Sequence, residues 1–263
     1  MDRPLTSNAF TVDAASFAVR DRTLLGPVSL ELERARVYGL IGHNGSGKST
    51  LIKLLARQQE PTAGSISFSG RPLDRWGARE LARSLAYLPQ TTPAATGLTV
   101  EELAALGRYP WHGALGRFGP EDRRHVEEAL ALTDMTGFAG RLVDELSGGE
   151  RQRAWLAMLV AQNASVMLLD EPISALDLAH QVEVLGLVKE LSRRRDLCVV
   201  TVLHDPNMAA RYCDELIALR QGKLLTRGTP DEMMRDEVLK DIFGVDMGVF
   251  LHPATGQPIG YVQ

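Results

Sequence analysis

Short apolar runs, each followed by glycine or polar residues, recur along this chain. Val37–Ile41, Val166–Leu169 and residues 197–203 are the longest of these runs, and a shorter one ends at Pro89 and Gln90. Apolar runs of this length are typical of strands buried in a parallel sheet. Because the carboxyl ends of such strands meet at one edge of the sheet, we expect the residues after each run to lie close together.

Two other periodicities surround these runs. Residues 10–12 and 28–32 alternate between apolar and polar, and 64–70 lies between turn residues, which predicts antiparallel strands. Helical spacing marks Val100–Leu106 and 121–133, and again the positions Val184, Leu187, Val188 and Leu191. The pattern predicts one α/β domain over 1–263. Its parts are an antiparallel β portion to about residue 90, a helical portion at about 91–165, and alternating strands and helices from 166.

A glycine loop, residues 42–50, follows the first apolar run and fits the pattern G-x-x-x-x-G-K-[ST]. Its members are Gly42, His43, Asn44, Gly45, Ser46, Gly47, Lys48, Ser49 and Thr50. Leucines at helical spacing after Ser49 predict a helix from about Lys48, so backbone N–H groups can cradle a phosphate at the helix start. Lys48 would reach the β- and γ-phosphates of a nucleotide, and Ser49 would ligate Mg²⁺. The alternative is a turn without a ligand, which the full pattern disfavours.

Two carboxylates, Asp170 and Glu171, end the second long apolar run, and Pro172 closes it. Asp170 is placed to hold Mg²⁺ through water, and Glu171 to position the attacking water or act as its general base. Two solvated acids that merely end a strand are the alternative. The glycine loop upstream favours the catalytic interpretation.

A solitary histidine, His204, follows the third long run. At the carboxyl edge of a sheet it can touch the γ-phosphate and respond to its loss, although a lone histidine can equally be a structural hydrogen-bonding group. Asp205 and Pro206 then read as an N-cap and first helical residue. Gln90 reaches the same edge, and no local feature distinguishes it from a polar loop residue.

A second anion-binding turn is predicted at the start of a helix over 151–160. It consists of Ser147, Gly148, Gly149 and Glu150. One ATP hardly needs two such turns from a single chain. We therefore expect this turn to serve a nucleotide held mainly by a second copy.

Taken in order, these segments resemble the ATP-binding cassette (ABC) ATPases. The most specific is Leu-Ser-Gly-Gly-Glu at 146–150, the signature segment, which other P-loop ATPases lack. The resemblance implies a RecA-like core with antiparallel β and helical subdomains, and ATP with Mg²⁺ as ligands. It implies that two copies pair head to tail, each ATP lying between one glycine loop and the partner's signature segment. It also implies that Gln90 bridges Mg²⁺ and the membrane subunit, and that Asp177 links the two sites.

Segments outside the ATP chemistry, 107–118, 141–144 and 209–214, resemble the ATPase subunit of bacterial ferric hydroxamate importers. That likeness implies an integral membrane permease and, indirectly, a periplasmic siderophore-binding protein. It places the chain on the cytoplasmic face of the inner membrane. Importers of other ferric siderophores, haem or cobalamin remain alternatives. Tyr109, Trp111 and Phe118 are expected to dock on the permease, or alternatively to pack within the helical subdomain.

Three positions depart from the family pattern. Val19 stands where an aromatic residue commonly stacks on adenine, so we expect Phe17 or Arg20 to take that role in this chain. Ile173 replaces a frequent threonine, and Pro206 replaces an aliphatic residue. None of these changes removes a catalytic group, so an active ATPase is expected.

Composition excludes several other classes. The 263 residues include 29 basic and 33 acidic ones, a net charge of −4, which offers no broad nucleic-acid footprint. A soluble ABC protein acting on DNA or ribosomes is the alternative class, but this chain lacks the coiled-coil insertions, tandem cassettes or basic arms typical of it. A P-loop kinase or GTPase would leave the signature segment unexplained. Two cysteines without metal spacing suit a reducing compartment. No transmembrane run or signal segment is apparent, so a membrane location would come from a partner.

Overall fold

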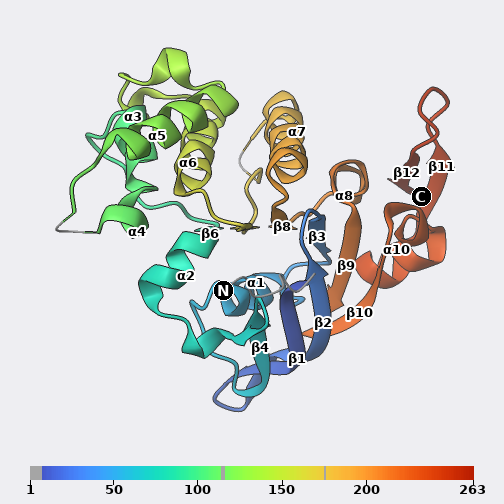
Figure 1. Ribbon diagram of the computed structural model, residues 1–263. Helices are drawn as coiled ribbons and strands as arrows, with labels where there is room; N and C mark the ends of the chain where they lie inside the picture. Colours follow the sequence, from blue (N-terminus) through green and yellow to red (C-terminus); the bar gives the residue numbers. More distant parts are fainter. Residues whose placement is uncertain (1–7, 114–115, 175) are drawn as a thin grey trace.

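A six-stranded sheet forms the centre of the protein in the computed structural model, which describes residues 8–113, 116–174 and 176–263 (Figure 1). Its strand order is β10-β9-β3-β8-β7-β6, and all neighbours are parallel except β9 and β10. The strands are β3 (Val37–Ile41), β6 (Leu85–Leu88), β7 (Val166–Leu169), β8 (Cys198–Val202), β9 (Glu215–Arg220) and β10 (Lys223–Gly228). Strands β3, β7 and β8 are buried along their whole length, which explains their uninterrupted apolar runs.

An antiparallel sheet, ordered β2-β1-β4-β5, lies at the bottom of Figure 1. Its strands are β1 (Asn8–Val19), β2 (Arg22–Glu33), β4 (Ala63–Phe68) and β5 (Arg71–Pro72). The alternating residues of β1 and β4 turn Phe10, Val12 and Phe68 into a core shared with α1 (Lys48–Leu55). The predicted antiparallel portion is therefore confirmed, with both long strands extending beyond the predicted ranges.

Helices gather away from that sheet, at the upper left of Figure 1. They are α3 (Val100–Leu106), α4 (Tyr109–His112), α5 (Pro120–Leu132) and α6 (Gly148–Gln162), while α2 (Ala78–Ser84) and α7 (Leu178–Arg195) flank the parallel sheet. Leu103, Val126 and Leu156 are fully buried between these helices. Helix α6 begins earlier than the predicted residue 151 because Ser147 caps it. Helical elements thus occupy the predicted span 91–165; its independence as a subdomain stays a prediction.

The C-terminal part contains elements that the sequence pattern did not predict. After α8 (Pro206–Tyr212) and α9 (Pro230–Met233) come α10 (Asp236–Phe243) and a hairpin of β11 (Met247–Leu251) and β12 (Pro258–Val262). A small core of Met234, Leu239 and Met247 holds this hairpin to the rest. Figure 1 shows it beside α10 and far from the glycine loop that precedes α1.

Candidate functional site

The carboxyl ends of four neighbouring strands bring the predicted site residues to one edge of the sheet. The glycine loop follows β3, His204 follows β8, Asp170 and Glu171 follow β7, and Gln90 follows β6. Because these strands are parallel and adjacent in the order β3-β8-β7-β6, segments far apart in sequence meet there. The convergence expected from the sequence is therefore present.

The side chain of Lys48 reaches back to the carbonyl oxygens of the glycine loop. Gly42 has φ of 136°, and a Cβ there would lie 2.3 Å from the carbonyl oxygen of Leu219, so only glycine fits. Lys48 is 4% exposed, and its Nζ donates to the carbonyl oxygens of Gly42 at 2.7 Å and His43 at 3.0 Å. Burial lowers the pKa of Lys48, while the nearby carboxylates of Glu171 and Asp170 oppose that shift. A buried cation facing two acids is thus held at the start of α1.

Ser49 and Asp170 form the next contact along this edge. The Ser49 hydroxyl donates to Asp170 Oδ1 at 3.1 Å, and Asp170 is 1% exposed. The other carboxylate oxygen, Asp170 Oδ2, is buried without a partner among the described residues. Burial raises the pKa of Asp170, and the Ser49 hydrogen bond only partly offsets this. A hydroxyl beside an unpartnered carboxylate oxygen is a donor set that suits a hard divalent cation.

Glu171 adopts a backbone conformation that is unusual for its residue type. Its φ is 55°, in the left-handed region, a strain of roughly 1–3 kcal/mol that tends to occur at functional sites. Its Oε1 lies 2.9 Å from His204 Nε2. Glu171 also lines two hollows, one with residues 44–50 and the other with Gln90. The carboxylate therefore lies between the glycine loop and Gln90, with His204 in contact.

The signature segment lies on the second of these hollows. Gly148 lines it together with Gln90 and Glu171, whereas Arg22, Leu24 and residues 44–50 line the hollow of the glycine loop. Ser147 and Glu150 make a reciprocal cap: Ser147 N donates to Glu150 Oε2 at 2.8 Å, and Glu150 N donates to Ser147 Oγ at 3.4 Å. Hydrogen bonds from the backbone N–H and the hydroxyl of Ser147 to this carboxylate lower the pKa of Glu150. Within one chain, then, the second turn does not complete the first.

Asp177 caps α7 and is exposed. Its Oδ1 accepts from His180 N at 3.0 Å, and His180 Nδ1 lies 2.8 Å from the same oxygen. These contacts hold the pKa of Asp177 below its usual range. Ala175, two residues before Asp177, lies outside the described residues, as do residues 1–7 and residues 114 and 115 of the segment 107–118.

Some lining residues were missed by the sequence reasoning. Arg22 and Leu24, just after the β1–β2 turn, line the glycine-loop hollow, and Thr92, Gln152 and Trp155 line the second one. Arg22 pairs with Val19 across the β1–β2 turn, so its closeness in sequence to the position expected near adenine could have indicated it. Val19 is exposed at 49%, while Phe17 is partly buried against the core. Arg22 is therefore a further candidate for contact with a nucleotide.

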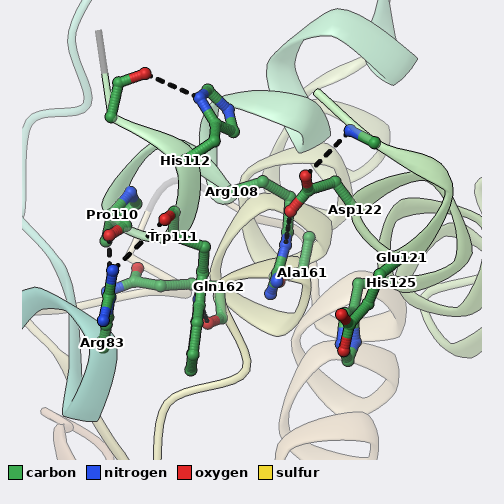
Figure 2. Close-up of polar contacts among 12 residues, drawn as sticks. Arg83, Arg108, Pro110, Trp111, His112, Glu121, Asp122, His125, Ala161 and Gln162 are labelled. Atoms are coloured by element: carbon green, nitrogen blue, oxygen red, sulfur yellow. Dashed lines mark hydrogen bonds and ion pairs between the residues drawn. The ribbon is translucent and has the colours of Figure 1, made fainter. Parts of the chain in front are cut away.

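The three predicted docking aromatics separate into two groups. Tyr109 is 54% and Phe118 is 42% exposed. Trp111 instead donates from Nε1 to the Gln162 carbonyl oxygen at 2.8 Å, and its ring lies between the guanidinium groups of Arg83 at 5.2 Å and Arg108 at 4.9 Å (Figure 2). For Trp111 these contacts favour the alternative, packing within the helical portion, whereas docking stays a prediction for Tyr109 and Phe118. The other two rings stay available.

The described residues bear on membrane contact and on metal binding in two ways. None of the helices in the described ranges combines the length and apolar character needed to cross a bilayer. The same residues contain no cluster of three or more His, Cys, Asp or Glu side chains arranged for a metal ion. A cation at this edge would take its remaining ligands from a bound nucleotide, as Mg²⁺ commonly does.

Known proteins resemble this chain over most of its length. The family described as ABC transporter matches residues 25–174. The iron(3+)-hydroxamate import ATP-binding protein of Bacillus subtilis is 37% identical over 252 residues, or 96% of this chain and 94% of its own length. The hemin import ATP-binding protein of Streptomyces coelicolor is 43% identical over 235 residues, or 89% of this chain and 83% of its own.

Solved structures agree. An ABC transporter described as of the metal-chelate type, in an inward-facing conformation, has a TM-score of 0.84 and 25% identity, covering 98% of this chain and 97% of that one. A dimeric ATP-binding cassette in a post-hydrolysis state with ADP and Pi has a TM-score of 0.73 and 25% identity, covering 84% of this chain and 98% of that one. The matched stretch 25–174 contains the glycine loop, the signature segment and both acids that follow β7.

Proposed function

Because the chain belongs to the ABC transporter family and is an ATP-binding, ATP-hydrolysing cassette of that family, we propose that it energises a membrane importer of iron(III)-hydroxamate siderophores. ATP binding would close two cassettes around two nucleotides, and hydrolysis would reopen them. Importers of other ferric siderophores or haem are the alternatives for cargo, since relatives named for achromobactin and hemin are 40% and 43% identical, against 37% for the hydroxamate relative. Cobalamin stays an alternative from the sequence resemblance alone.

One observation carries the proposed chemistry. Lys48, Asp170 and Glu171 meet at the carboxyl edge of the parallel sheet. Lys48 would exchange its loop carbonyl partners for the β- and γ-phosphates. Glu171 would orient the attacking water and take its proton. His204, in contact with Glu171 at 2.9 Å, would hold that carboxylate and touch the γ-phosphate.

Mg²⁺ fits the same edge. Ser49 Oγ would ligate it directly, Asp170 would hold it through water with the now unpartnered Oδ2, and Gln90 would complete the protein side. When bound, the ion would neutralise charge on the phosphate oxygens during transfer. The residues present therefore match the requirement, with two oxygen donors already adjacent.

A second copy of this chain would complete each nucleotide site. The hollow of the glycine loop and the signature segment are separate within one chain, and a dimeric cassette is among the structural relatives. Paired head to tail, Ser147, Gly148, Gly149 and Glu150 of one copy would face the nucleotide of the other, and exposed Asp177 would link the two sites. This arrangement accounts for two phosphate-binding turns in one cassette.

A permease would supply the membrane location. We place the chain on the cytoplasmic face of the bacterial inner membrane, with a periplasmic siderophore-binding protein delivering cargo on the other side. Tyr109, at the start of α4, and Phe118, which follows this helix, are exposed and are the proposed contact with that permease. The charge balance of −4 gives no support to nucleic acid as a partner.

The proposal is tested by purifying a tagged Glu171→Gln variant from membranes in Mg-ATP and identifying what accompanies it. The amide keeps the size of the side chain but removes the proton acceptor, so ATP should stay bound and the closed state should persist. Recovery of a polytopic permease supports the importer, and uptake assays with ferric hydroxamates, other siderophores and haem then identify the cargo. Recovery of nucleic acid or ribosomes without a membrane partner would overturn it.

A further inference from the structure

The first turns of α6 and α7 meet at a histidine that the proposed chemistry does not use. A Cβ built on Gly149 would lie 2.2 Å from His180 Cδ2 and 2.5 Å from Cγ. The imidazole therefore occupies the space that any side chain at position 149 would need. A side chain at position 149 of the signature segment would therefore displace the His180 ring.

The same imidazole is tied to Asp177. Oδ1 of that carboxylate accepts from the backbone N of His180 at 3.0 Å and lies 2.8 Å from its Nδ1. Oδ1 thus accepts the N-cap bond of α7 from His180 N and also contacts the imidazole of the same residue. One side chain consequently touches both segments that the head-to-tail arrangement turns toward the partner's nucleotide.

Neighbouring contacts reinforce this connection. Gln181 Nε2 donates to the carbonyl oxygens of Leu176 at 2.9 Å and Ile173 at 3.4 Å, which fastens the loop before α7. One turn further along both helices, Arg153 Nη1 and Glu183 Oε2 form an ion pair of 2.7 Å. The facing turns of α6 and α7 are therefore joined at more than one level, with His180 nearest to the partner-facing end.

We propose that His180 is a positioning residue that holds Asp177 and the Gly148–Gly149 turn in a fixed relation, so that both reach the partner's nucleotide together. The inference rests on the proposed head-to-tail function. Without the imidazole, Asp177 would keep its backbone cap but lose its side-chain partner, and a gap would open over Gly149. The two segments could then shift independently, which weakens closure while each chain still binds ATP through its own glycine loop.

The test measures ATP-dependent dimerisation in the Glu171→Gln background by light scattering after size exclusion. His180→Ala should weaken the Mg-ATP dimer about tenfold or more, the effect of losing a hydrogen bond to a charged group, while ATP affinity of the monomer stays unchanged. His180→Asn, which keeps a donor near Nδ1, should recover much of the loss. Glu190→Ala, which breaks an exposed ion pair with Arg194 within α7 alone, is the matched control and should dimerise normally.

The outcomes distinguish a failure of the positioning role of His180 from a failure of the proposed function. Equal dimerisation of the His180→Ala and parent proteins overturns the positioning role. Failure of the Glu171→Gln parent itself to dimerise overturns the proposed function instead. Should His180→Ala fail to fold, His180→Phe retains a ring against Gly149 without the bond to Asp177. A normal dimer from His180→Phe would likewise contradict the inference, and a weakened one would support it.

Discussion

Two buried polar clusters in this protein differ in how completely their hydrogen bonds are satisfied. At the carboxyl edge of the parallel sheet, Asp170 Oδ2 and Ser46 Oγ are buried without partners among the described residues. In the α4 cluster (Arg83, Arg108, Trp111, Asp122 and Gln162), Arg108 is 3% exposed yet bonds Asp122 at 2.9 Å and the Ala161 carbonyl oxygen at 2.8 Å (Figure 2).

The contrast extends to the acids of each cluster. Burial acts to raise the pKa of both Asp170 and Asp122. For Asp122 that effect is outweighed by hydrogen bonds from Gly119 N and the Arg108 guanidinium, so its pKa is lowered. An unpaired buried polar atom costs about 1–3 kcal/mol, and a ligand that supplies the missing partner removes this cost. The carboxyl edge of the parallel sheet is therefore arranged to bind a ligand, and the α4 cluster is arranged to stabilise the fold.

The largest effect is expected from breaking the α4 cluster. Asp122→Ala should lower the free energy of unfolding by about 3–5 kcal/mol, because it leaves the buried Arg108 guanidinium unpaired. Denaturant unfolding measures this change. Hydrolysis per folded chain should remain close to the parent value. A loss of activity in excess of the unfolded fraction would contradict the division between the two clusters.

The same acid gives a pH dependence whose sign follows from its lowered pKa. Stability from ionised Asp122 is complete above its ordinary pKa of 3.8 and is lost as the pH falls through the lower folded-state value. The stability difference between the parent and Asp122→Asn should therefore be full at neutral pH and shrink in strong acid. A difference that grew on acidification would show that the ionised carboxylate is not the stabilising form.

Lys48→Ala should remove function with little loss of stability. The ammonium is the cation nearest the proposed phosphate position, so we expect kcat to fall by at least about 10²–10³ and ATP binding to weaken. Fluorescent-nucleotide titration and phosphate release measure the two effects. Retained hydrolysis in a folded variant would place the phosphates elsewhere.

Asp170→Asn should stabilise the nucleotide-free protein modestly while removing its response to Mg-ATP. Because the folded-state pKa of Asp170 is raised, its ionisation costs stability as the pH rises above 3.8 toward that value, and at neutral pH the charge is a burden. The neutral amide avoids this cost but ligates Mg²⁺ poorly. Thermal unfolding with and without Mg-ATP tests both parts; a destabilised apo variant would contradict the account.

The smallest effect on the isolated chain is expected at the exposed aromatics. Tyr109→Ala and Phe118→Ala should change stability by no more than about 0.5 kcal/mol and leave hydrolysis unchanged. Their loss should appear only as reduced recovery of the permease from membranes. Trp111→Ala is the contrasting variant, since its ring lies between two guanidinium groups and should cost stability.

The strand edge could be predicted from sequence because its signals are local. Apolar runs that end in Gly42, Asp170 and His204 specify parallel strands, and the carboxyl-edge rule then places these residues together. Ser147 and Glu150 form the capping box that starts α6, a signal that the sequence contains although the predicted helix began only at residue 151. The structure confirms the fold class predicted from these signals, whereas the roles of the site residues stay predictions.

What the sequence pattern missed depends on contacts between distant segments. Trp111 was predicted as a docking aromatic, because its sequence neighbours do not indicate the contacts that it makes with Arg83 of α2 and Gln162 of α6. The β11–β12 hairpin has Gly260 packed on Leu239, which no local periodicity reveals. His180 reads as one polar residue of α7, and only the crossing with α6 places its ring on Gly149.

The most direct test of the account is phosphate release from Mg-ATP by the purified chain and by Glu171→Gln, alongside their nucleotide binding. The account predicts hydrolysis by the parent and a fall of about 10²–10⁴ in rate for the variant, with ATP affinity maintained because Lys48 and the glycine loop are untouched. Equal rates in the two proteins, or loss of binding together with turnover, would contradict the assignment of Glu171 as the group that activates water at this edge.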